Sequence, residues 1–151
     1  MIKIKPIQRQ NIIKVFGQPA DTSQFIKVPF PFGLRTSWNY ATVRTFYGHE
    51  YIADAVVDAL KSIQEYYGYQ WIRENDLDLY GGCFVDRNVR GGAHKSVHAW
   101  GLAIDYVPHL GQLGKPSMLP YHCVKAFTDR GFMWGGDWKR QDGQHFSAIV
   151  E

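Results

Sequence analysis

The clearest pattern of hydrophobic and polar positions lies between residues 49 and 67. Its apolar residues recur at steps of three and four, which places them on one face of an α-helix. They are Ile52, Ala53, Val56, Val57, Leu60, Ile63 and Tyr67. Gly68 follows directly and supplies the backbone freedom with which many helices end. The pattern predicts an amphipathic helix over residues 49–67.

Shorter segments downstream have the composition of β-strands. Each is rich in aromatic or β-branched residues and is bounded by glycine or turn residues. The predicted strands are 69–72, 80–85, 102–107, 132–134 and 145–150. Residues 119–130 carry apolar positions at helical spacing before Gly131 and predict a second helix. Because residues 108–118 hold two prolines and two glycines, we expect a surface loop there.

Residues 1–46 show no sustained periodicity. Proline, glycine and aromatic residues crowd this part of the chain, as in 29–33 and around Trp38. We therefore expect an irregular segment that wraps around the domain and packs through its aromatic rings.

Length and element order set the expected fold class. The chain has 151 residues, of which 45% are hydrophobic, enough for one globular domain with a core. Helices and strands occur in mixed order, which favours an α+β fold with a central antiparallel sheet flanked by helices. We expect a single compact domain over residues 1–151.

Charge and cysteine content exclude several classes of function. The 17 Lys and Arg residues against 14 Asp and Glu leave a formal net charge of +3, with no basic run dense enough to predict nucleic-acid binding. No stretch approaches the roughly 18 apolar residues of a membrane-spanning helix, and the N-terminus lacks the apolar core of a signal peptide. Neither Cys83 nor Cys123 belongs to a CxxC pair, so we expect two buried structural thiols.

The residues that can carry chemistry gather in two short motifs. In the first, His98 and Asp105 stand seven positions apart around Gly101; in the second, Asp142 and His145 stand three apart. Two histidines and an aspartate suit a Zn²⁺ ion that keeps a fourth position open for water, and the remaining carboxylate can then act as a base. A continuous helix would separate positions 98 and 105 by roughly 10.5 Å, so we expect the chain to turn at Gly101.

The order Ser96-x-His98-x-x-Gly101-x-Ala103-x-Asp105, followed by Asp142-x-x-His145, resembles the signature of a known peptidase family. This is the zinc D-Ala-D-Ala carboxypeptidase and L-alanyl-D-glutamate peptidase family, the VanX/VanY-like peptidoglycan peptidases. The chain is similar in particular to the phage endolysin branch, in which the second motif carries Asp where VanX-like members have Glu. A Gly-Gly-Asp-Trp segment precedes that motif in the branch, and residues 135–138 match it. The likeness runs from about residue 52 to residue 146 and implies the fold that these peptidases share with the Hedgehog signalling domain, without a separate wall-binding module.

The resemblance also implies roles for individual residues. His98, Asp105 and His145 would bind Zn²⁺, and Asp142 would be the general base. The family uses an arginine before the first motif to stabilise substrate charge. Arg87 is the nearest match, and Arg90 is its rival, with a second role for Arg90 in substrate binding.

Further side chains near the motifs have two possible roles each. Ser96 is either an orienting partner at the substrate site or a plain turn residue. Trp138, like the tryptophans at positions 100 and 134, either forms a wall for substrate or packs in the core. His94 and His109 flank the motifs and either line the cleft or face solvent from loops. Asp137 competes with the second-motif aspartate as the base.

We therefore predict a zinc-dependent peptidoglycan hydrolase of endolysin type that cleaves the L-Ala–D-Glu bond of the stem peptide. The same site could serve a D-alanyl-D-alanine carboxypeptidase, because either arginine could bind a free C-terminal carboxylate. A hypothesis of another class is a non-catalytic, zinc-containing binding module of Hedgehog type, which the four filled catalytic positions disfavour. We expect a monomer, made in the host bacterial cytoplasm without a signal peptide, that reaches the cell wall by another route.

Overall fold

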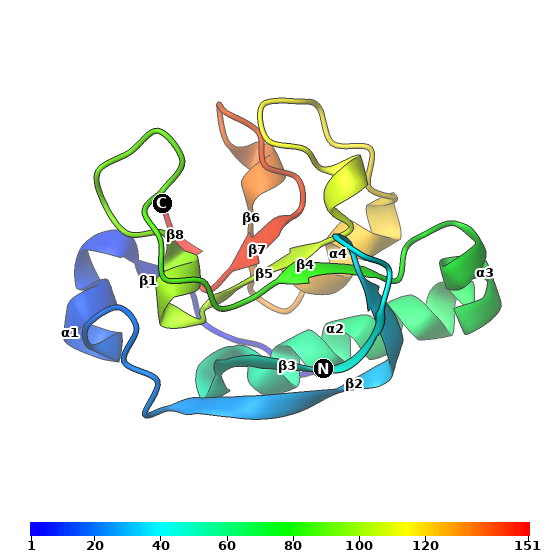
Figure 1. Cartoon of the computed structure of the whole chain (residues 1–151), viewed down its shortest axis with the longest axis horizontal. Helices are drawn as coiled ribbons and strands as arrows, with labels where there is room; N and C mark the ends of the chain where they lie inside the picture. The colour runs from blue at the N-terminus through cyan, green and yellow to red at the C-terminus, as the bar shows by residue number, and fades with distance from the viewer.

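A long β-hairpin and the helix that follows it form the base of the molecule (Figure 1). The computed structural model describes residues 1–151. In it, β2 (Phe25–Thr36) pairs antiparallel with β3 (Thr42–His49), and α2 (Glu50–Tyr67) follows directly. The predicted helix is confirmed, because its apolar stripe is buried and Gly68 ends it. His49 caps its N-terminus, where the imidazole Nδ1 accepts a hydrogen bond from the backbone N–H of Tyr51 at 3.0 Å.

The hairpin corrects the prediction of an irregular segment over residues 1–46. Val28, Phe30, Phe32 and Leu34 are buried at alternate positions of β2, which is the period of a strand with one face in the core. Proline and glycine occupy the outward positions between them and hide this alternation. They are tolerated because β2 pairs with β4 only at its last residues, 35 and 36, so that much of the strand has a free edge.

The remaining strands extend the hairpin into a six-stranded sheet of order β3-β2-β4-β5-β7-β6. They are β4 (Leu79–Gly82), β5 (Ala103–Tyr106), β6 (Met133–Trp134) and β7 (His145–Ser147). All neighbours are antiparallel except β2 and β4, so the sheet is mixed rather than purely antiparallel. With its helices it forms a single compact α+β domain, as predicted.

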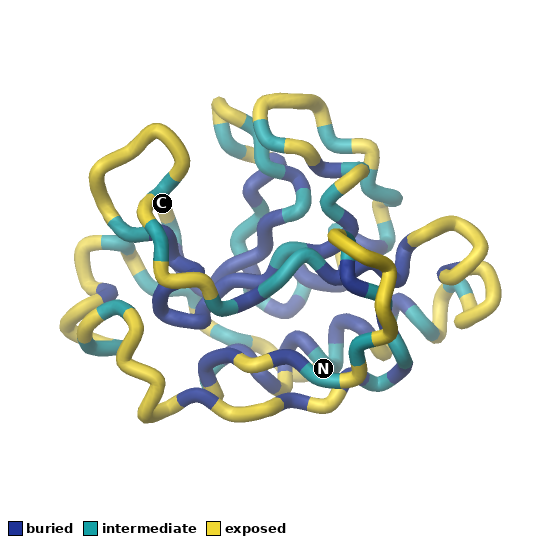
Figure 2. Tube along the Cα trace, viewed as in Figure 1, coloured by how far each residue is buried: buried dark blue, intermediate teal, exposed yellow.

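Helix α4 (Tyr121–Thr128) packs against α2, and both belong to the layer that covers the sheet (Figure 1). Its apolar residues Cys123, Ala126 and Phe127 face the core, which confirms the second predicted helix. The other cysteine, Cys83, is also buried and free, so both thiols are structural as expected. The buried positions concentrate along the sheet and the facing sides of the helices (Figure 2).

The chain ends meet in a separate pair of parallel strands, β1 (Ile7–Gln8) and β8 (Ile149–Val150). A short 3₁₀ turn, Arg9–Asn11, and α1 (Ile12–Phe16) follow β1. None of the helices combines the length and the apolar character that crossing a membrane requires.

Residues 69–72 were predicted as a strand, and this prediction is wrong. They belong to α3 (Tyr69–Glu74), a short helix in which only Ile72 is buried. Gln70 makes a side-chain contact typical of a helix, because it donates to Glu74 four residues on at 2.9 Å, while Trp71 stacks on Tyr67 at the end of α2. A segment of four residues, three of them aromatic or β-branched, is too short to distinguish the two periods.

Gly101 offers a test of the packing at the turn within the first motif, just before β5. Its φ of +64° is left-handed, and a Cβ there would lie 2.6 Å from the Phe25 ring and 3.0 Å from the backbone nitrogen of His49. Gly101→Ala should therefore cost both the left-handed strain of about 1–2 kcal/mol and a further ~1–3 kcal/mol for overpacking.

Gly114 is the matched control, since its φ is +79°, it is the third residue of a turn that the Lys115 N–H closes by donating to the Gln112 carbonyl, and no atom lies within 4 Å of a Cβ built there. Gly114→Ala should cost only the backbone strain. Urea denaturation of both variants measures the difference in unfolding free energy. Equal losses would show that the turn at Gly101 is not tightly packed.

Candidate active site

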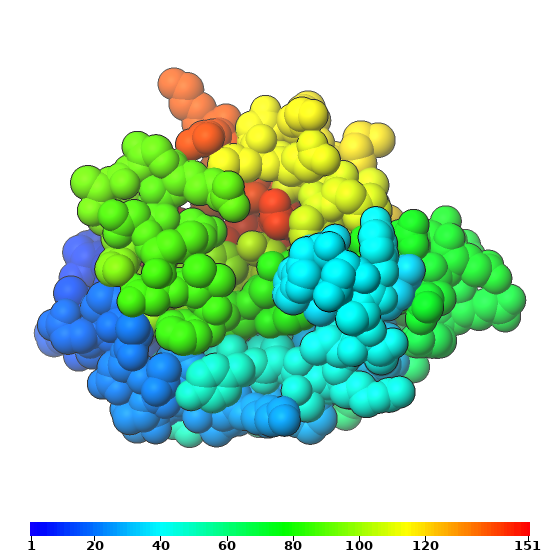
Figure 3. Space-filling view, viewed as in Figure 1, coloured from blue at the N-terminus to red at the C-terminus, as the bar shows by residue number.

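The two motifs meet in a cleft with a volume of about 1130 Å³. Its walls come from four segments distant in sequence: the hairpin tip around residues 37–40, the loop 87–98, the loop 108–113 and the segment 138–145. Figure 3 shows the hollow between the green and yellow loops, with the C-terminal strands in red at its floor and the cyan hairpin tip at its rim. The site is thus assembled by the tertiary structure.

His98 is fixed by a short 3₁₀ turn, Val97–Trp100. Ser96 caps this turn, since its hydroxyl accepts a hydrogen bond from the His98 backbone N–H at 3.3 Å, and Gly101 ends it in the left-handed conformation. The ring Nδ1 lies 2.7 Å from the carbonyl oxygen of Cys83 and donates to it. Such a hydrogen bond sets the tautomer and leaves Nε2 as the free donor atom. The expected turn at Gly101 is confirmed.

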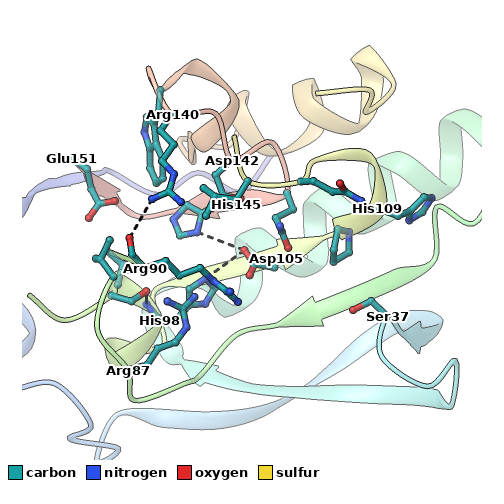
Figure 4. A pocket seen from close by; sticks show the side chains of 18 of the residues that line it. Ser37, Arg87, Arg90, His98, Asp105, His109, Arg140, Asp142, His145 and Glu151 are labelled. Atoms are coloured by element: carbon teal, nitrogen blue, oxygen red, sulfur yellow. Dashed lines mark hydrogen bonds and ion pairs between the residues drawn. The ribbon is translucent and has the colours of Figure 1, made fainter. Parts of the chain in front are cut away.

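Strand pairing brings Asp105 and His145 together. The two residues are direct partners in the antiparallel ladder of β5 and β7, so their side chains emerge on the same face of the sheet. Asp105 Oδ1 lies 3.3 Å from His98 Nε2 and 3.5 Å from His145 Nδ1 (Figure 4). One ligand atom from each residue lies within 4.8 Å of the others.

The electrostatics of this cluster favour a charged carboxylate. Burial opposes ionisation of Asp105, yet the two imidazoles beside it hold its pKa well below the ordinary value. Burial also lowers the pKa of His98, but the Asp105 carboxylate outweighs it and the pKa of His98 is raised. A concentrated negative charge therefore stands between two nitrogen donors.

The three residues fit a divalent metal ion. Asp105 Oδ1 and His145 Nε2 are buried without any hydrogen-bond partner, although nearly all buried polar atoms in proteins have one. A cation between the side chains would satisfy the carboxylate oxygen. Two imidazoles and one carboxylate form a donor set that zinc accepts, with a fourth position left for water or substrate.

Asp142 lies in the same cavity, in the turn that leads into β7. Its Oδ1 is a third buried atom without a partner. Burial raises the pKa of Asp142, and the nearby Asp105 charge adds to this, while the histidines at the site act against it. Its rival Asp137 is exposed and does not line the cavity. The structure therefore brings only one of the two candidate bases to the cluster.

The predicted catalytic residue Arg87 lines the cavity. The predicted substrate-binding residues Arg90, Ser96 and Trp138 line it too, as do His94 and His109. Of the two arginines, Arg87 carries the charge that acts on His98, where it opposes the rise in pKa that the Asp105 carboxylate causes. The Trp138 ring packs on the His145 ring with centroids 5.0 Å apart. The other two tryptophans near the motifs instead donate to backbone carbonyls, Trp100 to that of Gly17 and Trp134 to that of Gly143.

Sequence reasoning missed several residues of the cavity wall. Lys139 and Arg140 follow Trp138 directly, and Arg140 donates to the Arg90 carbonyl at 3.2 Å, which links two loops at the cleft (Figure 4). Their position beside the second motif was the only available signal. Ser37 and Tyr40 come from the hairpin, and no motif in the sequence pointed to them.

Comparison with known proteins agrees with this geometry. Residues 90–148 match the family model of D-alanyl-D-alanine carboxypeptidase. The matched segment contains both motifs, and therefore the three cluster residues His98, Asp105 and His145 and the candidate base Asp142. The match covers less than half of the chain and supports a relation to this peptidase family. No curated protein and no solved structure matches the chain significantly.

Metal binding by the cluster can be tested by substitution. His98→Ala and His145→Ala should each lower metal affinity strongly, because a site with two remaining ligands is incomplete. Metal content after dialysis, measured by inductively coupled plasma mass spectrometry, reports the loss. His122→Ala is the control, since His122 lies on α4 outside the cleft. Full metal content in either cluster variant would remove that residue from the ligand set.

Proposed function

We propose that this protein is a zinc-dependent peptidoglycan peptidase that hydrolyses an amide bond of the stem peptide. The observation that carries this proposal is the placement of Asp142, whose Oδ1 is buried without a hydrogen-bond partner, beside a cluster of two histidines and an aspartate in one cleft. A carboxylate left unpaired next to a metal-binding cluster is free to exchange a proton. The match to the carboxypeptidase family supports the same reaction class.

Zinc, when bound by His98, Asp105 and His145, supplies an acidic water and polarises the scissile carbonyl. Asp142 accepts the proton of the attacking water and later delivers it to the leaving nitrogen. Its raised pKa suits both transfers, because a base that must return its proton works best when its pKa approaches the working pH. The Cys83 carbonyl keeps the His98 ring oriented throughout, and the Ser96 hydroxyl holds the His98 backbone N–H.

We assign Arg87 the role of stabilising the negative charge that develops on the carbonyl oxygen of the scissile amide. Arg87 lines the cavity and its charge reaches the cluster, so it can donate hydrogen bonds where negative charge accumulates. Arg90 lines the same cavity, and its backbone carbonyl is held by Arg140. We assign Arg90 to binding of a substrate carboxylate.

Within this reaction class we propose cleavage of the L-Ala–D-Glu bond, as in phage endolysins. The aspartate at position 142 and the Gly-Gly-Asp-Trp segment at 135–138 support this choice. A D-alanyl-D-alanine carboxypeptidase is the second candidate, and the description of the matching family model favours it. A purely binding role of Hedgehog type is disfavoured because no catalytic position has been lost.

The base is tested by Asp142→Asn. The variant should keep its metal, because Asp142 is not in the ligand cluster, and should lose about 10²–10⁴-fold in kcat. Release of new amino groups from purified peptidoglycan measures the rate. Asp137→Asn, at the exposed aspartate, is the control and should retain activity. Undiminished turnover by the Asp142 variant would show that the base lies elsewhere.

The bond that is cleaved can be read from the products. Digestion of purified peptidoglycan followed by mass spectrometry should reveal peptides with a new free amine on D-Glu. Release of free D-Ala instead would establish the carboxypeptidase. Release of neither by the zinc-loaded protein would contradict the proposed peptidase.

A further inference from the structure

We propose that the tip of the β2–β3 hairpin, residues 37–40, is a subsite for the sugar portion of a glycopeptide substrate. The inference rests on the proposed function and adds to it a binding site outside the segment that matches the peptidase family, residues 90–148. Its two recognition residues are Trp38 and Tyr40.

Tyr40 stands in the wall of the catalytic cleft, and Trp38 lies two positions before it at the tip of the same hairpin. Ser37 and Tyr40 line the same cavity as Asp105 and His145. Trp38 lies between them in the chain and is 64% exposed, and Tyr40 is 60% exposed. In Figure 3 the cyan hairpin tip borders the opening opposite the green loop. A substrate that enters the cleft past the hairpin tip meets Tyr40, and the exposed Trp38 stands two residues away in the same turn.

The tip is a rigid turn. Tyr40 N–H donates to the Thr36 carbonyl at 2.9 Å, and Thr36 N–H donates to the Ala41 carbonyl at 2.9 Å. Asn39 Oδ1 accepts from the Ala41 N–H at 3.0 Å and from the Thr36 hydroxyl. Tyr40 has a φ of +58°, a conformation that costs about 1–2 kcal/mol in a residue with a side chain. The surrounding hydrogen bonds hold it there, and such strain is concentrated at functional sites.

A buried ion pair holds the tyrosine from behind. The Arg35 guanidinium lies 5.6 Å from the centre of the Tyr40 ring. It donates to both carboxylate oxygens of Asp78 at 2.7 Å, and the Asp78 side chain is fully buried. These contacts raise the pKa of Arg35, so the cation is permanent. The fixed cation supports the Tyr40 ring, and more than half of Tyr40 remains exposed to a ligand.

Sugar is the ligand whose chemistry fits these rings. A pyranose presents a flat C–H face, which packs on an aromatic ring as apolar surface, while its hydroxyl groups remain free at the edge. Trp and Tyr provide such surfaces with little loss of side-chain entropy and carry a polar group for a hydrogen bond. The stem peptide has only small or charged side chains and offers no comparable flat surface.

The position of the rings also bears on which bond is cleaved. In the stem peptide the L-Ala–D-Glu bond is one residue from the sugar, or roughly 3.5 Å of extended chain. The terminal D-Ala–D-Ala bond is four residues away, about 13–14 Å. A sugar subsite in the wall of the catalytic cavity therefore favours the bond next to the glycan.

The test compares two substrates with each variant. One is a disaccharide-linked stem peptide, and the other is the same peptide with an N-acetyl group in place of the sugar. The ratio of their kcat/KM values should fall at least about tenfold in Trp38→Ala and in Tyr40→Ala. Tyr121→Ala removes an aromatic ring that is 70% exposed on α4, outside the cleft, and should leave this ratio unchanged. An unchanged ratio in both hairpin variants would overturn the subsite.

A binding measurement separates this inference from the proposed function. The disaccharide of N-acetylglucosamine and N-acetylmuramic acid, titrated by calorimetry into the zinc-loaded protein, should bind the wild type and bind Trp38→Ala at least tenfold more weakly. If the wild type binds the disaccharide through Trp38 but cleaves no wall peptide, the subsite stands and the proposed peptidase fails. Absence of binding to the wild type, or equal binding to a folded Trp38→Ala variant, would overturn the subsite. Circular dichroism shows that the variants are folded.

Discussion

The register of β5 against β7 is the constraint on which the site depends. Asp105 stands opposite His145 in this ladder, and the pairing places both side chains at one cleft. Side chains alternate between the faces of a sheet, so a shift of one residue would send one of the two to the opposite face. The buried neighbours Ile104 and Phe146, direct partners in the same ladder, oppose such a shift because their apolar side chains would leave the core.

Burial then gives this constellation its chemical character. Three polar atoms at the site have no hydrogen-bond partner, and a carboxylate is held ionised between two imidazoles. Protein interiors rarely hold polar or charged atoms without partners, because burying such atoms unpaired costs free energy. A cation would satisfy the buried Asp105 oxygen, and the proposed function assigns proton transfer to the nearby Asp142. Burial and neighbouring charges shift the pKa values of the two carboxyl groups in opposite directions, lowering that of Asp105 and raising that of Asp142.

The two halves of the molecule contribute different parts of the site. The segment from the 87–98 loop to β7 supplies the metal-binding cluster, the candidate base and the arginines. The hairpin β2–β3 supplies Ser37 and Tyr40 to the cavity wall, and the ion-paired Arg35 lies beside the Tyr40 ring. Because β2 joins β4 through only two residue pairs, the hairpin tip is placed by a small number of backbone contacts and by the core beneath it. The proposed catalytic and recognition residues therefore share one cleft without sharing a sequence segment.

Local signals in the chain were enough to predict α2 and the turn at Gly101, and the two motifs, together with the family resemblance, pointed to four residues that the structure brings into one cleft. Each depends on short-range properties: the periodicity of a helix, the freedom of glycine, and the spacing of donor groups. Other features were decided only by tertiary structure. The hairpin was hidden because prolines occupy outward positions that only an incompletely paired strand allows, and α3 was misassigned because four residues do not define a period. The position of Asp137 outside the cavity, and the entry of Tyr40 into the cleft, depend on how distant segments pack, which no local pattern encodes.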